Sequence, residues 1–593
     1  MGARQFDFAL AIGGAAGQGI ATPGDILARI FVRRGLHLNT YNAYQSIIRG
    51  GHIFLTVRVS DQEVLTHGDR WDLLLCLDQS TMDRHLRHMQ SGSKVIFNAG
   101  TIEPEAAAEG VALCPMPVSE LTDNSRNAVM QNTVALGVII ALLRMDFKLL
   151  ETAMQLQFGR KGQAVVDENV TFSRAGFDYA TEHFDPFALD VPTGPKPLAV
   201  WSGNDALAMG GAAAGVKFYS AYPMSPATGI LHWMANNAQR LGIMVRQLED
   251  EIAVANVTVG AAHVGCRAMC ATSGGGFALM TEAIGMAGMM EVPAVFINVQ
   301  RAGPSTGVPT KTEQGDLWQA LGASQGDYER LIVAPLHSLD AFNTMPELFN
   351  LVDKCQCPAI LISDLLIAEG RSSVDPDAIN MQPEIDRGIL ITEPAASNGY
   401  LRYQDTESGI SPRALPGLEG SVHVVASDEH DEDGVLISDE FTDPHKRRKM
   451  VEKRARKLQD IVSRIAPPAL EGPADAEITL IGWGSTYGVI HEAIEMLNDR
   501  GITVNHLPIK WIVPFHASEV IDILSRANRT IIVENNYSGQ FARYLRSETG
   551  ISADAHIRKY DGEPFMPHHV VDGVIELMDK TTDRYIPFQE ILV

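Results

Sequence analysis

Hydrophobic residues along the chain form short runs of strand length, which alternate with longer segments of helical periodicity. The alternation begins at residue 6, restarts near residue 203 and restarts again near residue 476. Strands that alternate with helices are typical of parallel sheets covered by helices. The sequence therefore predicts an α/β fold with three units. The expected segments are 1–185, a linker at 186–200, 201–375, an irregular connection at 376–470, and 471–593.

Four short polar segments of the second unit each follow a predicted strand. The carboxyl ends of parallel strands meet at one edge of a sheet, and such sheets bind ligands at that edge. We therefore expect the carboxylate of Glu251, the hydroxyl groups of Ser225 and Thr228 and the guanidinium group of Arg301 to converge. These groups suit a cofactor ring and an acidic substrate. The segments are Tyr-Pro-Met-Ser-Pro-Ala-Thr (222–228), Gln-Leu-Glu-Asp-Glu (247–251), Thr-Ser-Gly-Gly-Gly-Phe (272–277) and Gln-Arg-Ala-Gly-Pro-Ser-Thr-Gly (300–307).

A glycine-rich segment, Gly-Gly-Ala-Ala-Gly-Gln-Gly (13–19), lies between a predicted strand at 6–12 and a predicted helix at 20–34. Bare backbone amides at a helix start favour anions, but the glycine spacing is not Gly-x-Gly-x-x-Gly. A tight structural turn and a contact with an anion or coenzyme A both stay open, and a nicotinamide dinucleotide is less favoured. The candidate contact residues are Gly13, Gly14, Gly17 and Gly19.

Three further segments carry polar residues whose role the pattern leaves open. Residues 44–52 form either a hydrogen-bonded loop or a surface facing the substrate or a second subunit, and their polar members are Gln45, Ser46, Arg49 and His52. The acidic run at 427–433 and the basic helix at 445–457 predict solvated surface, and we also expect partner contacts there. In the third unit, Gly-Trp-Gly-Ser-Thr (482–486) and Glu-Asn-Asn (534–536) lie at predicted strand ends.

Composition narrows the class of protein. The chain has 593 residues, of which 45% are hydrophobic and 20% charged, as in ordinary soluble globular proteins. No apolar run reaches the roughly 18 to 20 residues that span a bilayer, and the longest, at 134–143, predicts a buried helix. The amino-terminal residues do not resemble a signal peptide, so a cytoplasmic location is expected. The net charge of −24 argues against binding to nucleic acid or an anionic membrane.

The six cysteines do not have the spacing of a cluster site. An iron–sulfur cluster needs about four thiolates at recognisable spacing, and the chain contains no Cys-x-x-Cys pair. We expect reduced cysteines in the core and no metal ligands in this chain. The cysteines are Cys76, Cys114, Cys266, Cys270, Cys355 and Cys357.

The four segments of the second unit resemble the pyrimidine-binding domain of the 2-oxoacid:ferredoxin oxidoreductases. That family has a Tyr-Pro-x-Ser/Thr-Pro-x-Ser/Thr loop, a Glu-Asp-Glu helix start, Thr-Ser-Gly-x-Gly and Arg-x-Gly-Pro-Ser-Thr-Gly, and all four occur here in order. Residues 13–19 and Ser-Ile-Ile-Arg-Gly-Gly-His (46–52) resemble the gamma portion of the family, and the third unit resembles the carboxyl-terminal domain of transketolase-like enzymes. The chain thus resembles a fused gamma–alpha subunit, most like that of a 2-oxoglutarate-type enzyme. The resemblance is weakest at about 370–470.

The resemblance implies roles for the residues at the predicted sheet edge. Glu251 would bond the pyrimidine ring of thiamine diphosphate, with Tyr222 and Pro223 beside the cofactor. Arg301 would bind the substrate carboxylate through its two-pronged guanidinium group. The remaining candidates for substrate contacts are Ser225, where the family often has threonine, Thr228, and, for a second carboxylate, Lys311 and Arg49.

The resemblance also implies a partner. The diphosphate and its Mg²⁺ need a Gly-Asp-Gly…Asn type of site, and the chain contains no Gly-Asp-Gly. A beta subunit would supply that half of the cofactor site, the Mg²⁺ and a four-iron–four-sulfur cluster, in an (αβ)₂ heterotetramer. The implied reaction is oxidative decarboxylation of 2-oxoglutarate to succinyl-CoA and CO₂, with coenzyme A as co-substrate and ferredoxin as electron acceptor. In reverse the same reaction fixes CO₂.

Three alternatives stay open from the sequence. The same family includes enzymes for pyruvate, branched-chain 2-oxo acids and indolepyruvate, and Lys311 with the gamma-first order favours 2-oxoglutarate only modestly. A transketolase-like or dehydrogenase E1-like thiamine enzyme without ferredoxin would lack the gamma-like first unit. A non-catalytic NAD-binding or scaffold protein would not associate with a thiamine-binding subunit.

Overall fold

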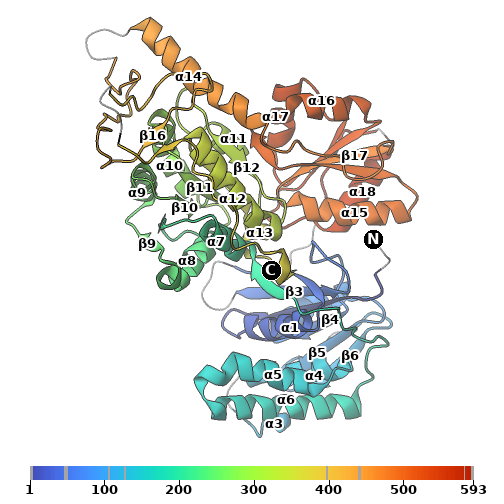
Figure 1. The fold of residues 1–593 in the computed structure, drawn as a ribbon. Helices are drawn as coiled ribbons and strands as arrows, with labels where there is room; N and C mark the ends of the chain where they lie inside the picture. The colour runs from blue at the N-terminus through green and yellow to red at the C-terminus, as the bar shows by residue number, and fades with distance from the viewer. Residues whose placement is uncertain are drawn as a thin grey trace.

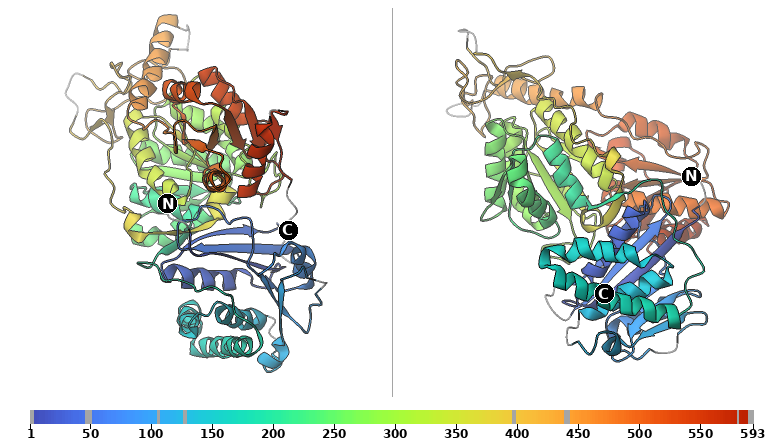
Figure 2. Two further views of the ribbon diagram at one scale, coloured as in Figure 1. Left: turned by 90° about the vertical axis from the view of Figure 1, so that its right-hand side faces the viewer. Right: turned by 60° about the horizontal axis from the view of Figure 1, so that its bottom comes forward.

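Three large sheets organise the described residues into three α/β units, so the predicted fold class is confirmed. A fourth sheet of two short strands, β15 (Leu390–Ile391) and β16 (Arg413–Ala414), lies in the connecting segment. The computed structural model describes residues 4–45, 51–104, 107–125, 129–394, 399–437, 443–579 and 581–588. We name the units by their sheets: the N-terminal, central and C-terminal units. The central and C-terminal units lie side by side above the N-terminal unit (Figures 1 and 2). No helix in the described ranges is long and apolar enough to cross a bilayer.

The N-terminal unit is built on a sheet of eight strands in the order β6-β5-β4-β1-β3-β2-β14-β7. Helices α1, α4 and α5 pack on one face, and α2 and Met566 of the C-terminal unit pack on the other. The predicted buried helix at 134–143 is confirmed in α4. The strands of this unit are β1 (Asp7–Ala15), β2 (His37–Ala43), β3 (His52–Ser60), β4 (Leu73–Cys76), β5 (Lys94–Asn98) and β6 (Ala112–Met116). The helices are α1 (Ala21–Arg33), α2 (Gln79–His85), α3 (Val118–Leu121), α4 (Met130–Leu142), α5 (Phe147–Phe158) and α6 (Gln163–His183).

Two strands from later in the chain complete the N-terminal sheet. β7 (Ala199–Ser202) and β14 (Arg371–Val374) form an antiparallel pair, and β14 pairs with β2 through Ser372 opposite Asn39. The predicted unit boundary near 200 thus falls in β7 and the one near 375 directly follows β14, and the division of the chain at these points stays a prediction. The pairing joins both ends of the central unit to the N-terminal unit.

The central unit has a parallel sheet with helices on both faces, the arrangement that places ligands at the carboxyl ends of the strands. Its order is β19-β12-β13-β11-β10-β8-β9, and only β19, which comes from the C-terminal unit, is antiparallel. Helices α7, α8 and α12 cover one face, and α9 and α10 cover the other. The strands are β8 (Phe218–Ala221), β9 (Met244–Gln247), β10 (Ala268–Thr272), β11 (Val295–Gln300), β12 (Leu331–Val333) and β13 (Ala359–Asp364). The helices are α7 (Gly203–Ala213), α8 (Thr228–Leu241), α9 (Glu251–His263), α10 (Gly274–Met289), α11 (Leu317–Leu321), α12 (Ser338–Cys355) and α13 (Leu365–Glu369).

The C-terminal unit has a parallel sheet in the order β18-β17-β20-β21-β22. One face packs under α15 and α18, and the other shares a continuous apolar core with α9 and α10 of the central unit. The strands are β17 (Ile478–Trp483), β18 (Val504–Ile509), β19 (Trp511–Val513), β20 (Thr530–Glu534), β21 (Ala555–Arg558) and β22 (Arg584–Tyr585). The helices are α15 (Thr486–Asp499), α16 (Ala517–Arg526), α17 (Gln540–Thr549) and α18 (Pro567–Met578).

The basic helix α14 (Pro444–Val462) is not solvated on all sides, contrary to the prediction from its charged residues. Its Lys453 and Lys457 are buried and bind the two carboxylate oxygens of Glu291 at 2.6 and 2.5 Å. Arg454 pairs with Glu429 of the acidic run. The prediction is wrong for this face of the helix because the acidic run and Glu291, which are distant in sequence, supply partners for its cations. Contacts with another protein at this segment stay a prediction.

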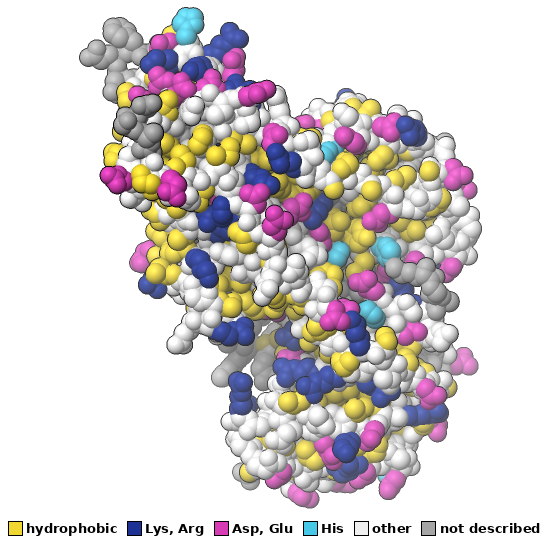
Figure 3. All heavy atoms as spheres, in the orientation of Figure 1, with side chains coloured by type: hydrophobic (Ala, Val, Ile, Leu, Met, Phe, Trp, Pro, Cys, Tyr) yellow, Lys and Arg dark blue, Asp and Glu magenta, His cyan; other side chains and the backbone are white. Residues whose placement is uncertain are grey.

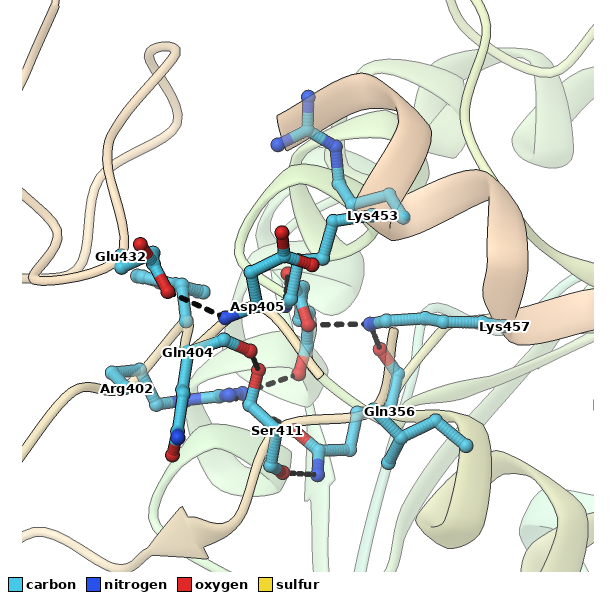
Figure 4. Close-up of polar contacts among 12 residues, drawn as sticks. Gln356, Arg402, Gln404, Asp405, Ser411, Glu432, Lys453 and Lys457 are labelled. Atoms are coloured by element: carbon cyan, nitrogen blue, oxygen red, sulfur yellow. Dashed lines mark hydrogen bonds and ion pairs between the residues drawn. The ribbon is translucent and has the colours of Figure 1, made fainter. Parts of the chain in front are cut away.

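A buried polar cluster surrounds the two lysines, as Figure 4 shows. Lys457 donates to the backbone oxygen of Gln356, whose side chain accepts from Arg402 and donates to the backbone oxygen of Ser411. Burial raises the pKa of Glu291, but Lys457, Lys453 and Arg402 outweigh burial and hold it well below its usual range. Burial lowers the pKa of Lys453 to about 7. The cluster attaches the connecting segment to the central unit.

Replacing Glu291 with glutamine should strongly destabilise the chain, because Lys453 and Lys457 would stay buried without a counter-charge. We expect a loss of about 3 kcal/mol in urea-induced unfolding near pH 7. The folded pKa of Glu291 lies below its unfolded value, so its contribution is complete above about pH 4.3 and declines as the pH falls further. Glu452→Gln is the matched control, since Glu452 forms an exposed pair with Arg448 on the same helix. It should change stability little, because solvent screens an exposed pair, and equal effects of the two variants would contradict the prediction.

Candidate functional site

The predicted sheet edge exists in the central unit, where the residues after β8, β9, β10 and β11 lead into helices or long loops. Glu251 is the first residue of α9, and Asp250 caps that helix by accepting a hydrogen bond from the backbone of Ala253 at 2.8 Å. A carboxylate in the first turn is favoured by the positive end of the helix. The capped helix start therefore fixes where the Glu251 side chain leaves the backbone.

The Glu251 carboxylate is buried and incompletely bonded. The residue is 3% exposed, and its Oε1 atom has no hydrogen-bond partner among the described residues. A side chain at Gly276 is excluded, because its Cβ would lie 2.5 Å from Glu251 Oε1 and 2.2 Å from Thr272 Oγ1. Buried polar atoms are normally paired, so an acceptor held in this way is equipped to receive a hydrogen bond from a ligand.

Arg301 follows β11 and ties two of the four predicted segments together. Its Nη1 atom donates to the backbone oxygen of Ser225 at 2.7 Å. Burial lowers the pKa of Arg301 while the nearby carboxylate of Asp316 raises it, and guanidinium stays charged at neutral pH. The Ser225 contact leaves further donors of the guanidinium fork available. Arg301 can therefore bind an anion beside the loop at 222–228.

A cavity of about 390 Å³ adjoins Arg301, between the start of α10, the loop at 301–316 and residues 536–540 of the C-terminal unit. Two carboxyl groups face it. Burial, followed by the charge of Asp316, raises the pKa of Glu313 to about 7. Burial also raises the pKa of Asp316, against the opposing effects of its hydrogen bond from Asn298 and the charge of Arg301. The cavity can therefore change its charge near neutral pH.

The C-terminal unit holds the loop that carries Arg301. The backbone of Gln314 donates to Asn535 at 2.7 Å, and the backbone of Asn535 donates back to Gln314 Oε1 at 3.0 Å. Gln314 Nε2 also donates to the backbone oxygen of Trp483 at 2.7 Å, and Gln540 Nε2 donates to that of Gly315 at 2.7 Å. The predicted strand-end segments at 482–486 and 534–536 thus shape the site. The sequence did not indicate Gln314 or Gln540, because their contacts lie between units.

The other candidates of the loop at 222–228 lie at the surface. Tyr222 is 39% exposed, and Pro223 and the Ser225 side chain are also exposed. Thr228 begins α8 and lines a second cavity of about 490 Å³ between the central unit and α1 of the N-terminal unit. These residues are near the site edge, and their contacts with a ligand stay predictions.

The two residues predicted to bind the second carboxylate of the substrate, Lys311 and Arg49, have different outcomes in the structure. Lys311 forms an ion pair with Glu563 of the C-terminal unit, and its side chain is 13% exposed. Arg49 and Ser46 lie outside the described residues. His52 of the same segment begins β3, with its Nε2 atom 3.0 Å from Nε2 of His85. The structure therefore places Arg301 and Asp316 on one cavity and Glu251 and Asp316 at the start of α10, beside Gly276 and Gly274, but it holds Lys311 in a separate contact.

The glycine-rich segment forms a shorter turn than predicted. Gly13 and Gly14 lie in β1, because β3 pairs with that strand as far as His52 opposite Ala15. Gly17 and Gly19 have φ angles of +98° and +75°. Gln18 closes the turn by accepting from the backbone of Ala15, and its own backbone oxygen accepts from Asn132. These internal contacts favour the structural-turn interpretation, and a ligand contact of the four glycines stays a prediction.

Cysteine and metal-ligand side chains do not gather at the site. Five of the six cysteines are buried, Cys266 is half-buried, and all are unpaired. Among the described residues, no group of three or more His, Cys, Asp or Glu side chains could hold a metal ion.

Comparison with known proteins gives one family throughout the chain. Residues 209–452 match the family model described as pyruvate flavodoxin/ferredoxin oxidoreductase, thiamine diP-bdg. Residues 9–179 match the model described as pyruvate ferredoxin/flavodoxin oxidoreductase, and residues 476–570 match core domain II of pyruvate:ferredoxin oxidoreductase.

Two curated relatives and one solved structure are similar over nearly their whole lengths. The alpha subunit of 2-oxoacid:ferredoxin oxidoreductase 2 from Aeropyrum pernix is 30% identical, over 98% of this chain and 99% of that protein. The 2-oxoglutarate oxidoreductase subunit KorA of Mycobacterium tuberculosis is 29% identical, over 94% and 89%. The solved 2-oxoglutarate:ferredoxin oxidoreductase from Magnetococcus marinus, with 2-oxoglutarate, coenzyme A and succinyl-CoA bound, has a TM-score of 0.89 and 31% identity, over 96% of this chain and 99% of that chain.

Replacing Glu251 with glutamine should stabilise the isolated chain. A buried carboxylate with an unpaired oxygen is costly, and a neutral amide of the same shape costs less to bury. We expect unfolding in urea to require about 1 kcal/mol more free energy, although the change also removes a favourable charge at a helix start. Asp250→Asn is the control, because asparagine retains the cap and should change stability by no more than about 0.5 kcal/mol. A loss of stability in Glu251→Gln would show that the carboxylate is a structural group.

Proposed function

The chain belongs to the 2-oxoacid:ferredoxin oxidoreductase family as an alpha subunit, and we propose that, together with a beta subunit, it converts 2-oxoglutarate, coenzyme A and oxidised ferredoxin to succinyl-CoA, CO₂ and reduced ferredoxin. The reverse reaction fixes CO₂. One observation carries the proposal: the buried, unpaired oxygen of Glu251 lies at the same sheet edge as the guanidinium group of Arg301. The 2-oxoglutarate named in the relatives from M. tuberculosis and M. marinus supports the choice of substrate.

Glu251 suits the pyrimidine ring of thiamine diphosphate. Its Oε1 atom is buried and unpaired, and Gly276 leaves room beside it. Glu251 would accept a hydrogen bond from a protonated ring nitrogen and hold that proton, and the exposed Tyr222 and Pro223 would border the same cofactor. When bound, the cofactor supplies the nucleophilic carbon that such decarboxylations need. The protein's part is to orient the ring and to keep water away from this bond.

Arg301 suits the carboxylate next to the ketone of a 2-oxo acid. A guanidinium group can donate two parallel hydrogen bonds to a carboxylate, and the contact with Ser225 uses Nη1 only. The Ser225 hydroxyl is exposed beside it and would donate to the substrate. Thr228, Lys311 and Arg49 remain predicted substrate contacts, and Lys311 would have to leave Glu563 to reach the distal carboxylate.

A beta subunit would supply the groups that this chain lacks. It would bring the diphosphate site with its Mg²⁺ and the four-iron–four-sulfur cluster that passes electrons to ferredoxin, in an (αβ)₂ assembly. Hydrophobic side chains along α9 and α10 and directly after α9 support such a contact, since they are 40–56% exposed and one of them, Ile252, directly follows Glu251. Figure 3 shows hydrophobic side chains on the visible surface around these helices. The exposed members are Ile252, Val257, Val264 and Leu279.

The test is an assay of this chain co-purified with a beta subunit. Reduction of methyl viologen is followed with coenzyme A and either 2-oxoglutarate, pyruvate or 2-oxoisovalerate. We expect 2-oxoglutarate to be preferred, and Glu251→Ala to lower kcat by about 10²-fold or more. Arg301→Lys should raise KM for the 2-oxo acid by about tenfold, because lysine cannot donate in the bidentate manner.

Two outcomes separate the parts of the proposal. Turnover of another 2-oxo acid alone would keep the family reaction and reject the substrate. No turnover of any of them, in a complex that contains cofactor and cluster, would reject the reaction.

The substrate KM should rise with pH through about 7. Glu313 is largely neutral below its pKa of about 7 and charged above it, and a negative charge in the cavity opposes an anion at Arg301. We expect roughly a fivefold rise in KM between pH 6 and pH 8, a change of about 1 kcal/mol. Glu313→Gln should remove this dependence, whereas Glu282→Gln, on the exposed side of α10, should retain it. A pH profile of KM that is the same in all three proteins would contradict this role for Glu313.

A further inference from the structure

One carboxylate of the C-terminal unit binds a residue from each of the other two units. Glu563 Oε1 binds Lys311 of the loop at 301–316, and Glu563 Oε2 accepts a hydrogen bond from Tyr41 of β2 at 2.6 Å. Glu563 is 7% exposed and Tyr41 2% exposed. All three side chains are therefore largely shielded from water at the junction of the three units.

The contact is selective for these partners. Asp561, the other carboxylate of the same turn, pairs with Lys559 and does not compete for Lys311. Burial, then the charge of Glu563, raises the pKa of Tyr41 well above its usual value, so its hydroxyl stays a donor. Removing the charge of Glu563 would leave both Lys311 and Tyr41 without their buried acceptor, and such losses are costly.

The contact reaches Arg301 through a short backbone path. The backbone of Thr312 donates to Gly562 at 3.0 Å, so the loop and the turn that carries Glu563 are also joined through the main chain. The backbone of Ala302 donates to Lys311 at 3.0 Å, and Val308 donates to Ala302 at 2.9 Å. Lys311 thus closes a loop whose first residue adjoins Arg301. Movement of Lys311 would be passed to Arg301 through one peptide unit.

We propose that Glu563 is a positioning residue for Arg301. By binding both Lys311 and Tyr41, it holds the loop at 301–316, which we call the arginine loop, in one place relative to the N-terminal unit. Its effect on a 2-oxo acid rests on the function proposed above, but the structural part does not. On this proposal Lys311 stays bound to Glu563, which replaces the contact with the distal carboxylate that was predicted for Lys311 above. Productive binding needs a substrate carboxylate held in a narrow geometry, which a loosened arginine loop would not provide.

The first experiment needs no enzyme activity. Hydrogen exchange is measured on the isolated chain for the backbone amides of residues 302–312, in wild type, Glu563→Gln and Lys311→Met. The matched control is Glu492→Gln, which breaks a buried 2.5 Å ion pair with Arg58 between the N-terminal and C-terminal units and does not contact the arginine loop. We expect exchange about tenfold faster in the first two variants, unchanged exchange in the control, and near wild-type exchange in Lys311→Arg. Unchanged exchange in Glu563→Gln would overturn the proposal.

The second experiment assays the same variants in the complex with a beta subunit. Glu563→Gln should raise KM for the 2-oxo acid about tenfold with kcat within about twofold of wild type, and Glu492→Gln should change neither. A fall in KM in Glu563→Gln would mean that the released Lys311 binds substrate, and would overturn the proposal. An equal rise in KM in the control would overturn it as well. An inactive wild-type complex would reject the proposed function, and the exchange experiment would still decide the structural role of Glu563.

Discussion

The site depends on keeping one carboxylate dry and incompletely bonded. Glu251 is 3% exposed with an unpaired oxygen, a state that folding alone does not favour. Three features make it possible: the cap by Asp250, the positive end of α9, and the missing side chain at Gly276. The first two lie at the start of α9 and the third at the start of α10, and these helix starts meet because the strands before them are parallel. More than one segment of the central unit thus offsets the free-energy cost of burying this carboxylate.

The second requirement is that the arginine loop be held from outside its own unit. The loop at 301–316 lies between elements, and its own backbone hydrogen bonds join Ala302, Val308 and Lys311 only to one another. Gln314 exchanges hydrogen bonds with Asn535, and Lys311 pairs with Glu563, so the C-terminal unit holds the loop at two points. The C-terminal unit therefore shapes the cavity beside Arg301, which its residues 536–540 also line. The shared apolar core with α9 and α10 gives that unit a fixed position from which to act.

Buried charged residues also depend on partners that are distant in the sequence. A run of basic residues on α14 appears as a solvated helix when only neighbouring residues are considered, yet Lys453 and Lys457 are buried against Glu291. Burial of a cation is tolerable only with a counter-charge, and that partner lies about one hundred and sixty residues earlier in the chain. Helical periodicity contains no information about it. The consequence is that the connecting segment is attached to the central unit.

The sequence by itself determined the α/β class, the strands β8, β9, β10 and β11, and the residue types at their ends, because local hydrophobic runs and the edge rule for parallel sheets need no distant information. It thereby indicated Glu251 and Arg301. Only the tertiary structure decided that β7 and β14 join the N-terminal sheet, that Gly13 and Gly14 extend β1, and that Lys311 pairs with Glu563. Each of these depends on a partner strand or counter-charge far away in the chain. Such pairings are selected by register and burial in the folded molecule, which no local pattern contains.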